Sequence, residues 1–237
     1  ITRFHYYIND YQNRPTPSHL FLHMATGSGK TLVMAANILQ LYEKGYRKFI
    51  FVTNLKNTID KTKENFLNNS LENQKYLFAD SININDQAIE INEVKNFSRI
   101  SEADINIHFT SIQALQIKMQ NPTEDGLSED DFENNDIGII WDESHHGNVQ
   151  TQAVQAELGN FDNWESTVKQ LLDLNPRNIL IEFSATMDFE NSDIEKKYRN
   201  KRIYDYSLKQ FRLDQYSKEI KATQIKTEPL DRILIGI

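Results

Sequence analysis

The residues of this chain with the clearest chemistry form a glycine-rich stretch near its N-terminus. The candidate ligand-binding residues of the stretch are Ala25, Thr26, Gly27, Ser28, Gly29, Lys30 and Thr31. Glycines in such a loop allow backbone conformations in which successive N–H groups turn toward phosphate oxygens at the start of the next helix. The lysine would reach the β- and γ-phosphates of a nucleotide, and the threonine hydroxyl would bind Mg²⁺.

The segments on either side of this loop support a nucleotide phosphate-binding site. Residues 19–24 form an apolar run typical of a buried strand. Residues 30–43 show the apolar spacing of a helix, and Gly45 follows as a stop signal. Met24 is a departure, because the strict pattern has a small residue six positions before the lysine. The alternative interpretation is a glycine-rich turn that only connects a strand to a helix.

Two adjacent carboxylates form the second candidate site. Asp142 and Glu143 directly follow residues 137–141, an apolar run that predicts a strand. Ligands bind at the carboxyl ends of the strands in open parallel sheets. Asp142 would hold Mg²⁺ through water, and Glu143 would orient the water that attacks the γ-phosphate. Together with Lys30, these two residues are the predicted catalytic residues.

Two other interpretations of the second site remain open. One is a solvated acidic turn with histidines beside it. The other is a zinc site at His145 and His146, although the chain has no cysteine and no helical His-Glu-x-x-His spacing.

Further segments follow expected strands in a fixed order along the chain. Polar residues come after the apolar residues 48–52, within residues 109–113, and at residues 184–186 after the apolar residues 179–183. The segments 24–31, 142–145 and 184–186 resemble motifs I, II and III of superfamily 2 helicases and translocases. Within that superfamily, residues 142–146, 205–212 and 216–219 resemble the Res subunit of type III restriction enzymes most.

This resemblance implies contacts with a nucleic-acid backbone. The implied contact residues are Thr53, Asn54, Lys56, Thr110 and Ser111. Hydroxyls, amides and backbone N–H groups at strand-to-helix turns can bind phosphate without reading bases, which suits a motor that moves along any sequence. The alternative is that the threonines, the serine and the asparagine cap the helices that follow them.

The resemblance also implies how the site communicates with the rest of such a motor. Ser184 and Thr186 would couple the nucleotide site to a second RecA-like lobe, and His145 would link the second motif to them by a hydrogen bond. In the family, arginines of the second lobe close over the γ-phosphate, and a nuclease domain and a DNA-methyltransferase subunit complete the restriction system. No segment matching those arginines follows Ser184 in this chain.

Composition sets limits but does not identify an activity. With 237 residues and 39% hydrophobic content, the chain can bury one large α/β core. The sequence has no long apolar run and no secretory leader, so we expect a cytoplasmic protein without a membrane span. The net charge of −8 argues against a protein that wraps nucleic acid by bulk electrostatics. Part of that charge falls in residues 121–131, which predict a solvated surface loop.

The order of helical and strand patterns predicts the architecture. Helical and strand signals alternate without repeats, which favours an α/β fold with a mostly parallel sheet and helices on both faces. The expected parts are a lead-in segment at residues 1–18, a RecA-like P-loop NTPase lobe at 19–206, and the start of a connection to a second lobe at 207–237. Residues 76–78 and 88–91 predict an extra hairpin or edge strands. A capping box at Asp162 predicts a helix before the strand at residue 179.

These observations lead to one functional hypothesis with three alternatives. The chain is expected to be the ATP-binding lobe of a nucleic-acid-dependent ATPase, acting on duplex DNA and hydrolysing ATP weakly without its second lobe. The alternatives are an RNA helicase lobe, a non-motor P-loop enzyme such as a nucleotide kinase or GTPase-like switch, and a module that binds nucleotide only as a structural ligand. The sequence lacks the Asn-Lys-x-Asp segment and the arginine-rich lid that a non-motor enzyme would need.

Overall fold

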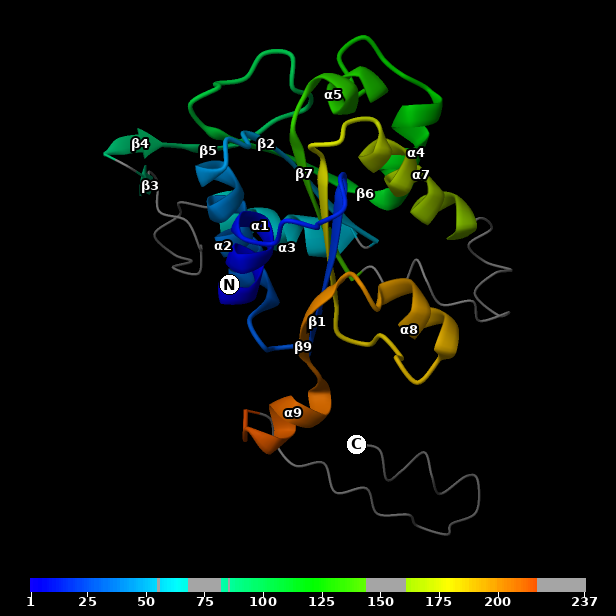
Figure 1. The fold of residues 1–237 in the computed structure, drawn as a ribbon. Helices are drawn as coiled ribbons and strands as arrows, with labels where there is room; N and C mark the ends of the chain where they lie inside the picture. The colour runs from blue at the N-terminus through cyan, green and yellow to red at the C-terminus, as the bar shows by residue number, and fades with distance from the viewer. Residues whose placement is uncertain (55, 68–81, 85, 144–160, 217–237) are drawn as a thin grey trace, which may run out of the picture.

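Seven parallel strands form the main sheet of the computed structural model (Figure 1). They are β1 (Ser18–Met24), β2 (Lys48–Thr53), β5 (Ile91–Glu93), β6 (Ile105–Ser111), β7 (Ile137–Asp142), β8 (Ile179–Ser184) and β9 (Arg202–Tyr206). Their order across the sheet is β5-β6-β2-β7-β8-β1-β9. The structure describes residues 1–54, 56–67, 82–84, 86–143 and 161–216.

Helices cover both faces of this sheet. They are α1 (Thr2–Asn9), α2 (Lys30–Glu43), α3 (Lys56–Leu67), α4 (Ile112–Gln120), α5 (Glu129–Asn134), α7 (Phe161–Asp173), α8 (Ser192–Tyr198) and α9 (Leu208–Leu213). Phe49 and Phe51 of β2 pack in one core with residues of α1, α2 and α3. Their neighbours Ile50 and Val52 pack in a second core with residues of α4, α5 and α7. This arrangement confirms the predicted parallel sheet with helices on both faces, and explains why the central strands β2, β7 and β8 are buried along almost their whole length.

The elements that position the predicted sites have the expected bounds within one residue. Strand β1 begins at Ser18, one residue before the predicted start, and α2 spans the predicted range 30–43. The helix expected from residue 162 is α7. Of the residues predicted to form an extra hairpin or edge strands, 88–91 overlap β4 (Gln87–Ile89), which pairs antiparallel with β3 (Ile82–Ile84). Residues 76–78 lie outside the part of the chain that the structure describes.

The acidic segment around residue 125 differs from its prediction. Residues 121–131 were expected to form a solvated loop, but helix α5 begins at Glu129. The Asp131 carboxylate accepts a hydrogen bond from the backbone N–H of Ser128 at 3.0 Å. Leu127 is fully buried, so this segment is anchored in the second core. Residues 121–128 do form a loop that is mostly exposed, so the prediction is wrong only for the start of α5 and for buried Leu127, because a capping box and an apolar side chain lie among the carboxylates.

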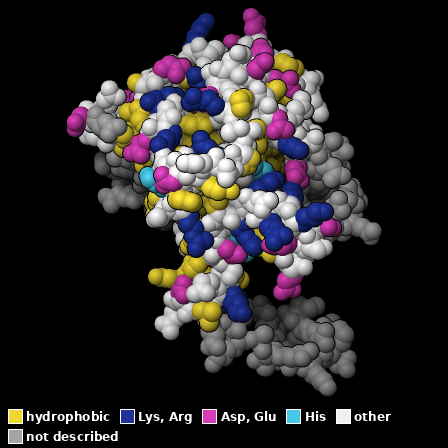
Figure 2. Space-filling model, in the orientation of Figure 1, with side chains coloured by type: hydrophobic (Ala, Val, Ile, Leu, Met, Phe, Trp, Pro, Cys, Tyr) yellow, Lys and Arg dark blue, Asp and Glu magenta, His cyan; other side chains and the backbone are white. Residues whose placement is uncertain are grey.

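The lead-in segment holds α1, and its side chains reach the core. Phe4 and Tyr7 are buried with residues of β1 and α2. At the surface, Lys and Arg side chains alternate with Asp and Glu on the face shown in Figure 2. Among the described residues, no helix is both long enough and apolar enough to cross a membrane.

Candidate nucleotide-binding site

The glycine-rich loop leaves β1 and enters the N-terminus of α2. Gly27 and Gly29 have φ angles of 82° and 91°, in the left-handed region that glycine adopts without strain. Ser28 closes the turn, because its hydroxyl donates a hydrogen bond to the carbonyl of Ala25 at 2.7 Å. Nothing lies within 4 Å of the position that a Cβ on Gly29 would occupy. The loop is therefore open on the side of its second glycine.

The start of α2 offers free hydrogen-bond donors to this opening. Gly29 is the N-cap of α2, and no side chain caps the helix there. The first backbone N–H groups of a helix have no partner within the helix, and the helix dipole favours an anion beside them. Both features suit phosphate oxygens. Met24, the departure from the strict pattern, is buried in the core below the loop.

The second motif lies at the end of the central strand β7. Asp142 is 8% exposed and pairs in register with Thr53 on one side and Phe183 on the other. Glu143 follows it with a φ of 56°, which is unusual for a residue other than glycine. The backbone N–H of Glu143 donates a hydrogen bond to Asp142 Oδ1 at 3.0 Å. The two carboxylates are thus held in a tight turn, and strained backbone of this kind occurs often at active sites.

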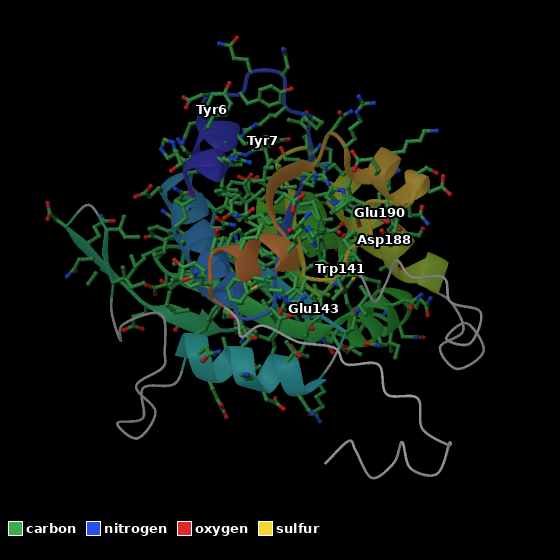
Figure 3. All side chains as sticks on the ribbon, turned by 90° about the horizontal axis from the view of Figure 1, so that it is seen from below. Tyr6, Tyr7, Trp141, Glu143, Asp188 and Glu190 are labelled. Carbon is green, nitrogen blue, oxygen red and sulfur yellow. The ribbon has the colours of Figure 1, made fainter. Side chains whose placement is uncertain are left out.

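An ion pair joins the two motifs. Lys30 Nζ lies 3.3 Å from Glu143 Oε1, and the side chains are 10% and 24% exposed. The residues are more than a hundred positions apart in the sequence, and the parallel sheet brings them together. Glu143 lies near the middle of the structure when viewed from below (Figure 3). The predicted catalytic lysine and glutamate are therefore in one site.

The donor groups present fit Mg²⁺ bound together with phosphate. Thr31 lies in the first turn of α2, and Asp142 supplies a nearly buried carboxylate. Magnesium is commonly held by one or two protein oxygens, with waters and phosphate oxygens completing the shell. Among the described residues, no cluster of three or more histidine, cysteine or acidic side chains could hold a metal ion by itself. His145 and His146 lie outside the described residues.

The end of β2 contributes to the same site, a placement that no local sequence pattern predicts. The side-chain amide of Asn54 donates a hydrogen bond to the backbone carbonyl of Glu143 at 3.1 Å. Thr53 Oγ1 and Asn54 Oδ1 are buried and accept or donate no hydrogen bond within the described structure. Buried polar atoms without partners are costly, and they are retained most often where a ligand or water completes them. Lys56 is exposed at the start of α3.

The other predicted nucleic-acid contacts lie at the end of β6. Ser111 caps α4, because its hydroxyl accepts a hydrogen bond from the N–H of Ala114 at 3.2 Å. Helix capping, the alternative interpretation of this serine, is therefore confirmed. Thr110 is 3% exposed and Thr53 is fully buried, so Asn54, Lys56 and Ser111 are the more accessible members of the predicted set.

The third motif lies between the strands that carry the first two. Strand β8 pairs with β7 and with β1, and Ser184 at its end pairs in register with His23. Ser184 is buried, whereas Thr186 is exposed and donates its backbone N–H to the Ser184 hydroxyl at 3.4 Å. Of the predicted coupling residues, Ser184 and Thr186 thus lie at the end of a strand between those that carry the two candidate sites, and His145 lies outside the described residues.

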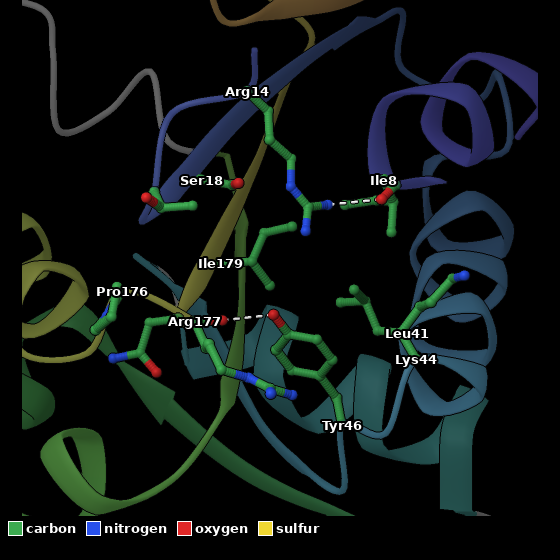
Figure 4. A pocket seen from close by; sticks show the side chains of 11 residues that line it. Ile8, Arg14, Ser18, Leu41, Lys44, Tyr46, Pro176, Arg177 and Ile179 are labelled. Atoms are coloured by element: carbon green, nitrogen blue, oxygen red, sulfur yellow. Dashed lines mark hydrogen bonds between the residues drawn. The ribbon is translucent and has the colours of Figure 1, made fainter. Parts of the chain in front are cut away.

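A cavity of about 310 Å³ lies at the opposite, amino-terminal end of the strands (Figure 4). Arg14 Nη1 donates a hydrogen bond to the carbonyl of Ile8 at 2.7 Å, and the Tyr46 hydroxyl donates one to the carbonyl of Arg177. Burial and the charge of Asp136 raise the pKa of Tyr46, so its hydroxyl stays protonated. The first contact ties the segment after α1 back to α1, and the second ties the segment after α2 to the residues before β8, which is a structural role.

Comparison with known proteins identifies the family. The chain matches the family described as "Type III restriction enzyme, res subunit" over residues 4–189. It is also 37% identical over 244 aligned positions to the probable type III restriction-modification enzyme HindVIP Res subunit of Haemophilus influenzae, covering 95% of this chain. The chain belongs to the Res subunit family. This Res-family chain spans 46% of the length of that relative.

Solved helicases are among the structures similar to this Res-family chain. The UvsW helicase from bacteriophage T4 has a TM-score of 0.45 with 14% identity, covering 82% of this chain and 55% of that one. Mss116p bound to ssRNA and AMP-PNP has a TM-score of 0.46 with 11% identity, covering 83% of this chain and 38% of that one. The Res-family chain has the fold of a RecA-like P-loop NTPase lobe.

Proposed function

We propose that the chain is the ATP-binding lobe of a nucleic-acid-dependent ATPase, the helicase or translocase motor of a type III restriction enzyme. The observation that carries this proposal is the 3.3 Å contact between Lys30 Nζ and Glu143 Oε1. It brings the lysine of the phosphate-binding loop to the carboxylate suited to activate water. A glycine-rich turn that only linked a strand to a helix would not require this contact between Lys30 and Glu143.

In this proposal the loop and the start of α2 bind the triphosphate of ATP. Backbone N–H groups of residues 27–31 donate to phosphate oxygens, and Lys30 holds the β- and γ-phosphates. The ammonium of Lys30 already faces an anionic oxygen of Glu143, so γ-phosphate oxygens would share this cation. Magnesium, held by Thr31 and Asp142 together with phosphate oxygens, would neutralise charge on the phosphates.

Glu143 is the proposed residue that prepares the attacking water. Its carboxylate can accept a hydrogen bond from the attacking water and so align the water oxygen with the γ-phosphorus. Its backbone is fixed on both sides, by Asp142 through the N–H and by Asn54 through the carbonyl. Such fixing limits the geometries that the carboxylate can adopt, which is what positioning catalysis needs.

Brisk turnover is expected to need a further group from outside this lobe. An arginine that stabilises the transition-state charge is worth on the order of 10³ or more in rate. We propose that a second RecA-like lobe of the same polypeptide provides it, with Ser184, Thr186 and His145 relaying closure. A nuclease domain and a DNA-methyltransferase subunit would complete the restriction function in the cytoplasm.

The proposed track is duplex DNA, contacted through its backbone. Asn54, Lys56 and Ser111 lie at the carboxyl ends of β2 and β6, with Thr53 and Thr110 beneath them. Their hydroxyl and amide groups can bind phosphate without reading sequence. Because Asn54 also holds Glu143, a nucleic acid that moved Asn54 would change the position of the proposed catalytic carboxylate.

The deciding experiment is ATP turnover by the complete polypeptide with plasmid duplex DNA or single-stranded RNA. Lys30→Ala serves as the blank, and Lys44→Ala is a matched control because this exposed lysine follows the other end of α2. Stimulation by duplex DNA, absent in Lys30→Ala and retained in Lys44→Ala, is the expected result. Stimulation by RNA alone would assign the chain to RNA helicases. No stimulation by either would favour a non-motor nucleotide-binding protein.

A further inference from the structure

Helix α9 lies beside the phosphate-binding loop although it comes about 180 residues later in the chain. Strand β9 pairs with β1, and the backbone N–H of Ala25 donates to the carbonyl of Tyr206 at 2.9 Å. The chain then turns into α9, drawn in orange beyond the ends of β1 and β9 in Figure 1. Phe211 Cζ lies 3.9 Å from the position that a Cβ on Gly27 would occupy. An aromatic ring therefore lies against the loop.

Three aromatic rings form a continuous cluster there, which we call the α9 aromatic cluster: Tyr206, Phe211 and Tyr216. The ring of Phe211 meets that of Tyr206 edge to face, with centroids 6.0 Å apart and an interplanar angle of 90°. It stacks on Tyr216 with centroids 5.8 Å apart and an angle of 26°. The cluster thus extends from Gly27 outward along α9.

Core packing does not account for this cluster. None of the six residues of α9 is buried, Phe211 is only partly buried, and Tyr216 is 72% exposed. A helix that served only to cover the sheet edge would bury its apolar side chains. Here the Tyr216 side chain stays largely exposed, and the partly exposed Phe211 ring lies between it and the phosphate-binding loop, so a ligand with a flat ring can reach the outer part of the cluster.

The charges around the cluster suit a phosphorylated ligand. Lys209 and Arg212 are exposed on α9. The acidic neighbour, Asp214, accepts hydrogen bonds from the Tyr206 hydroxyl at 2.7 Å and from Gln210 Nε2 at 2.7 Å. The hydrogen bond to Asp214 raises the pKa of Tyr206 to about 12, so the phenol stays neutral. The cluster therefore presents neutral rings, two exposed cations and one carboxylate, Asp214, whose oxygens are engaged by Tyr206 and Gln210.

We propose that the α9 aromatic cluster is the base-stacking platform of the nucleotide site, with Phe211 and Tyr216 holding the purine ring of a nucleotide whose phosphates lie in the loop at Gly27 to Thr31. This inference rests on the proposed nucleotide site. Stacking on an aromatic side chain tolerates any base, because every base has a π-face. ATP and GTP are therefore expected to bind with similar affinity.

The experiment measures binding of AMP-PNP and of inorganic tripolyphosphate, each with Mg²⁺, to the complete polypeptide by titration calorimetry. Tripolyphosphate carries the charge of the nucleotide but has no base. Phe211→Ala and Tyr216→Ala are expected to weaken AMP-PNP binding about tenfold and to leave tripolyphosphate binding unchanged. Retained tripolyphosphate binding also shows that the loop is folded. Leu213→Ala, at an exposed position on the same helix, is the matched control.

A conservative series separates stacking from packing. Phe211→Tyr keeps a ring and should bind AMP-PNP like the unchanged protein, whereas Phe211→Leu keeps apolar volume and should bind like Phe211→Ala. Two results would contradict the proposed base-stacking platform. One is full AMP-PNP affinity in Phe211→Leu, and the other is an equal loss of affinity for AMP-PNP and tripolyphosphate in Phe211→Ala. Lys30→Ala tests the proposed phosphate site separately, because it should weaken the binding of both AMP-PNP and tripolyphosphate. If Lys30→Ala weakens both and the Phe211 variants change neither, only the platform fails.

Discussion

The side-chain amide of Asn54 hydrogen-bonds to the backbone carbonyl of Glu143 at 3.1 Å. Asn54 follows β2 and Glu143 follows β7, so this bond ties together the ends of two neighbouring strands. Glu143 has a left-handed backbone conformation that costs about 1–3 kcal/mol for a residue other than glycine. Asn54 is one of the groups that hold it there, which makes a predicted nucleic-acid contact a positioning residue for the proposed catalytic carboxylate.

Asn54→Ala is therefore expected to impair turnover more than nucleotide binding. The substitution removes a hydrogen bond worth about 1.4 kcal/mol. If this loss raises only the activation free energy of hydrolysis, kcat falls about tenfold. The measurement is nucleic-acid-stimulated ATP turnover of the complete polypeptide, with kcat and KM separated. Asn57→Ala, at an exposed position on α3, is the matched control. An unchanged kcat with a raised KM for DNA would mean that Asn54 contributes only to nucleic-acid binding.

Glu143→Gln tests the proposed role of the carboxylate itself. The amide keeps the size of the side chain but cannot accept a proton, so turnover should fall by about 10²-fold or more while ATP remains bound. Rapid filtration with radiolabelled ATP would detect the trapped nucleotide. Glu190→Gln provides a control at an exposed position on the loop before α8. Turnover at the original rate would exclude Glu143 as the water-activating group.

Local patterns explain how much of this site could be predicted from sequence. The glycines at 27 and 29, the apolar strand before Asp142 and the apolar periodicity of α2 each act within a few residues. Their structural consequences follow from backbone sterics and hydrophobic burial, so the loop, β7 and α2 have the expected bounds. The order of helical and strand patterns similarly predicted the parallel sheet.

Relationships between distant segments could not be predicted in the same way. The Asn54–Glu143 hydrogen bond depends on β2 and β7 being neighbours, although the chain passes through β5 and β6 between them. The position of Phe211 against Gly27 depends on β9 joining the sheet beside β1. Sequence patterns indicate strands, but the order of strands across a sheet is set by the packing of the whole domain.

A buried carboxylate on β8 is another feature that an apolar strand pattern conceals. Glu182 is 2% exposed, and its carboxylate is held by His19 Nε2 and by the Tyr198 hydroxyl, the latter at 2.8 Å. Burial alone would raise the pKa of Glu182, but the charge of His19 and the hydrogen bonds from His19 and Tyr198 lower it below its usual value. The folded chain therefore stabilises the ionised form of Glu182 relative to the unfolded chain.

The pKa of Glu182 predicts how stability depends on pH. A folded-state pKa below the ordinary value of 4.5 means that this contribution is complete above pH 4.5 and is lost as pH falls through the folded-state pKa. Glu182→Gln should lower the free energy of unfolding at pH 7 by on the order of 2 kcal/mol. The difference from the unchanged chain should shrink below pH 4. Denaturant titrations at pH 7, 5 and 3 would measure it, with Glu190→Gln as the exposed control. A difference that stays constant down to pH 3 would contradict the assignment.

Gly138 of β7 pairs in register with Phe49 of β2. A Cβ there would approach Phe49 Cδ1 to 2.8 Å and Leu41 Cδ1 to 3.3 Å, and both side chains are fully buried. Because a packed core cannot move aside freely, Gly138→Ala should lower the free energy of unfolding by about 1–3 kcal/mol. Chemical denaturation measures this change. Adding Phe49→Leu removes the ring that clashes, so the double variant should be more stable than the sum of the two single effects predicts. Strict additivity would show that Phe49 does not confine this position.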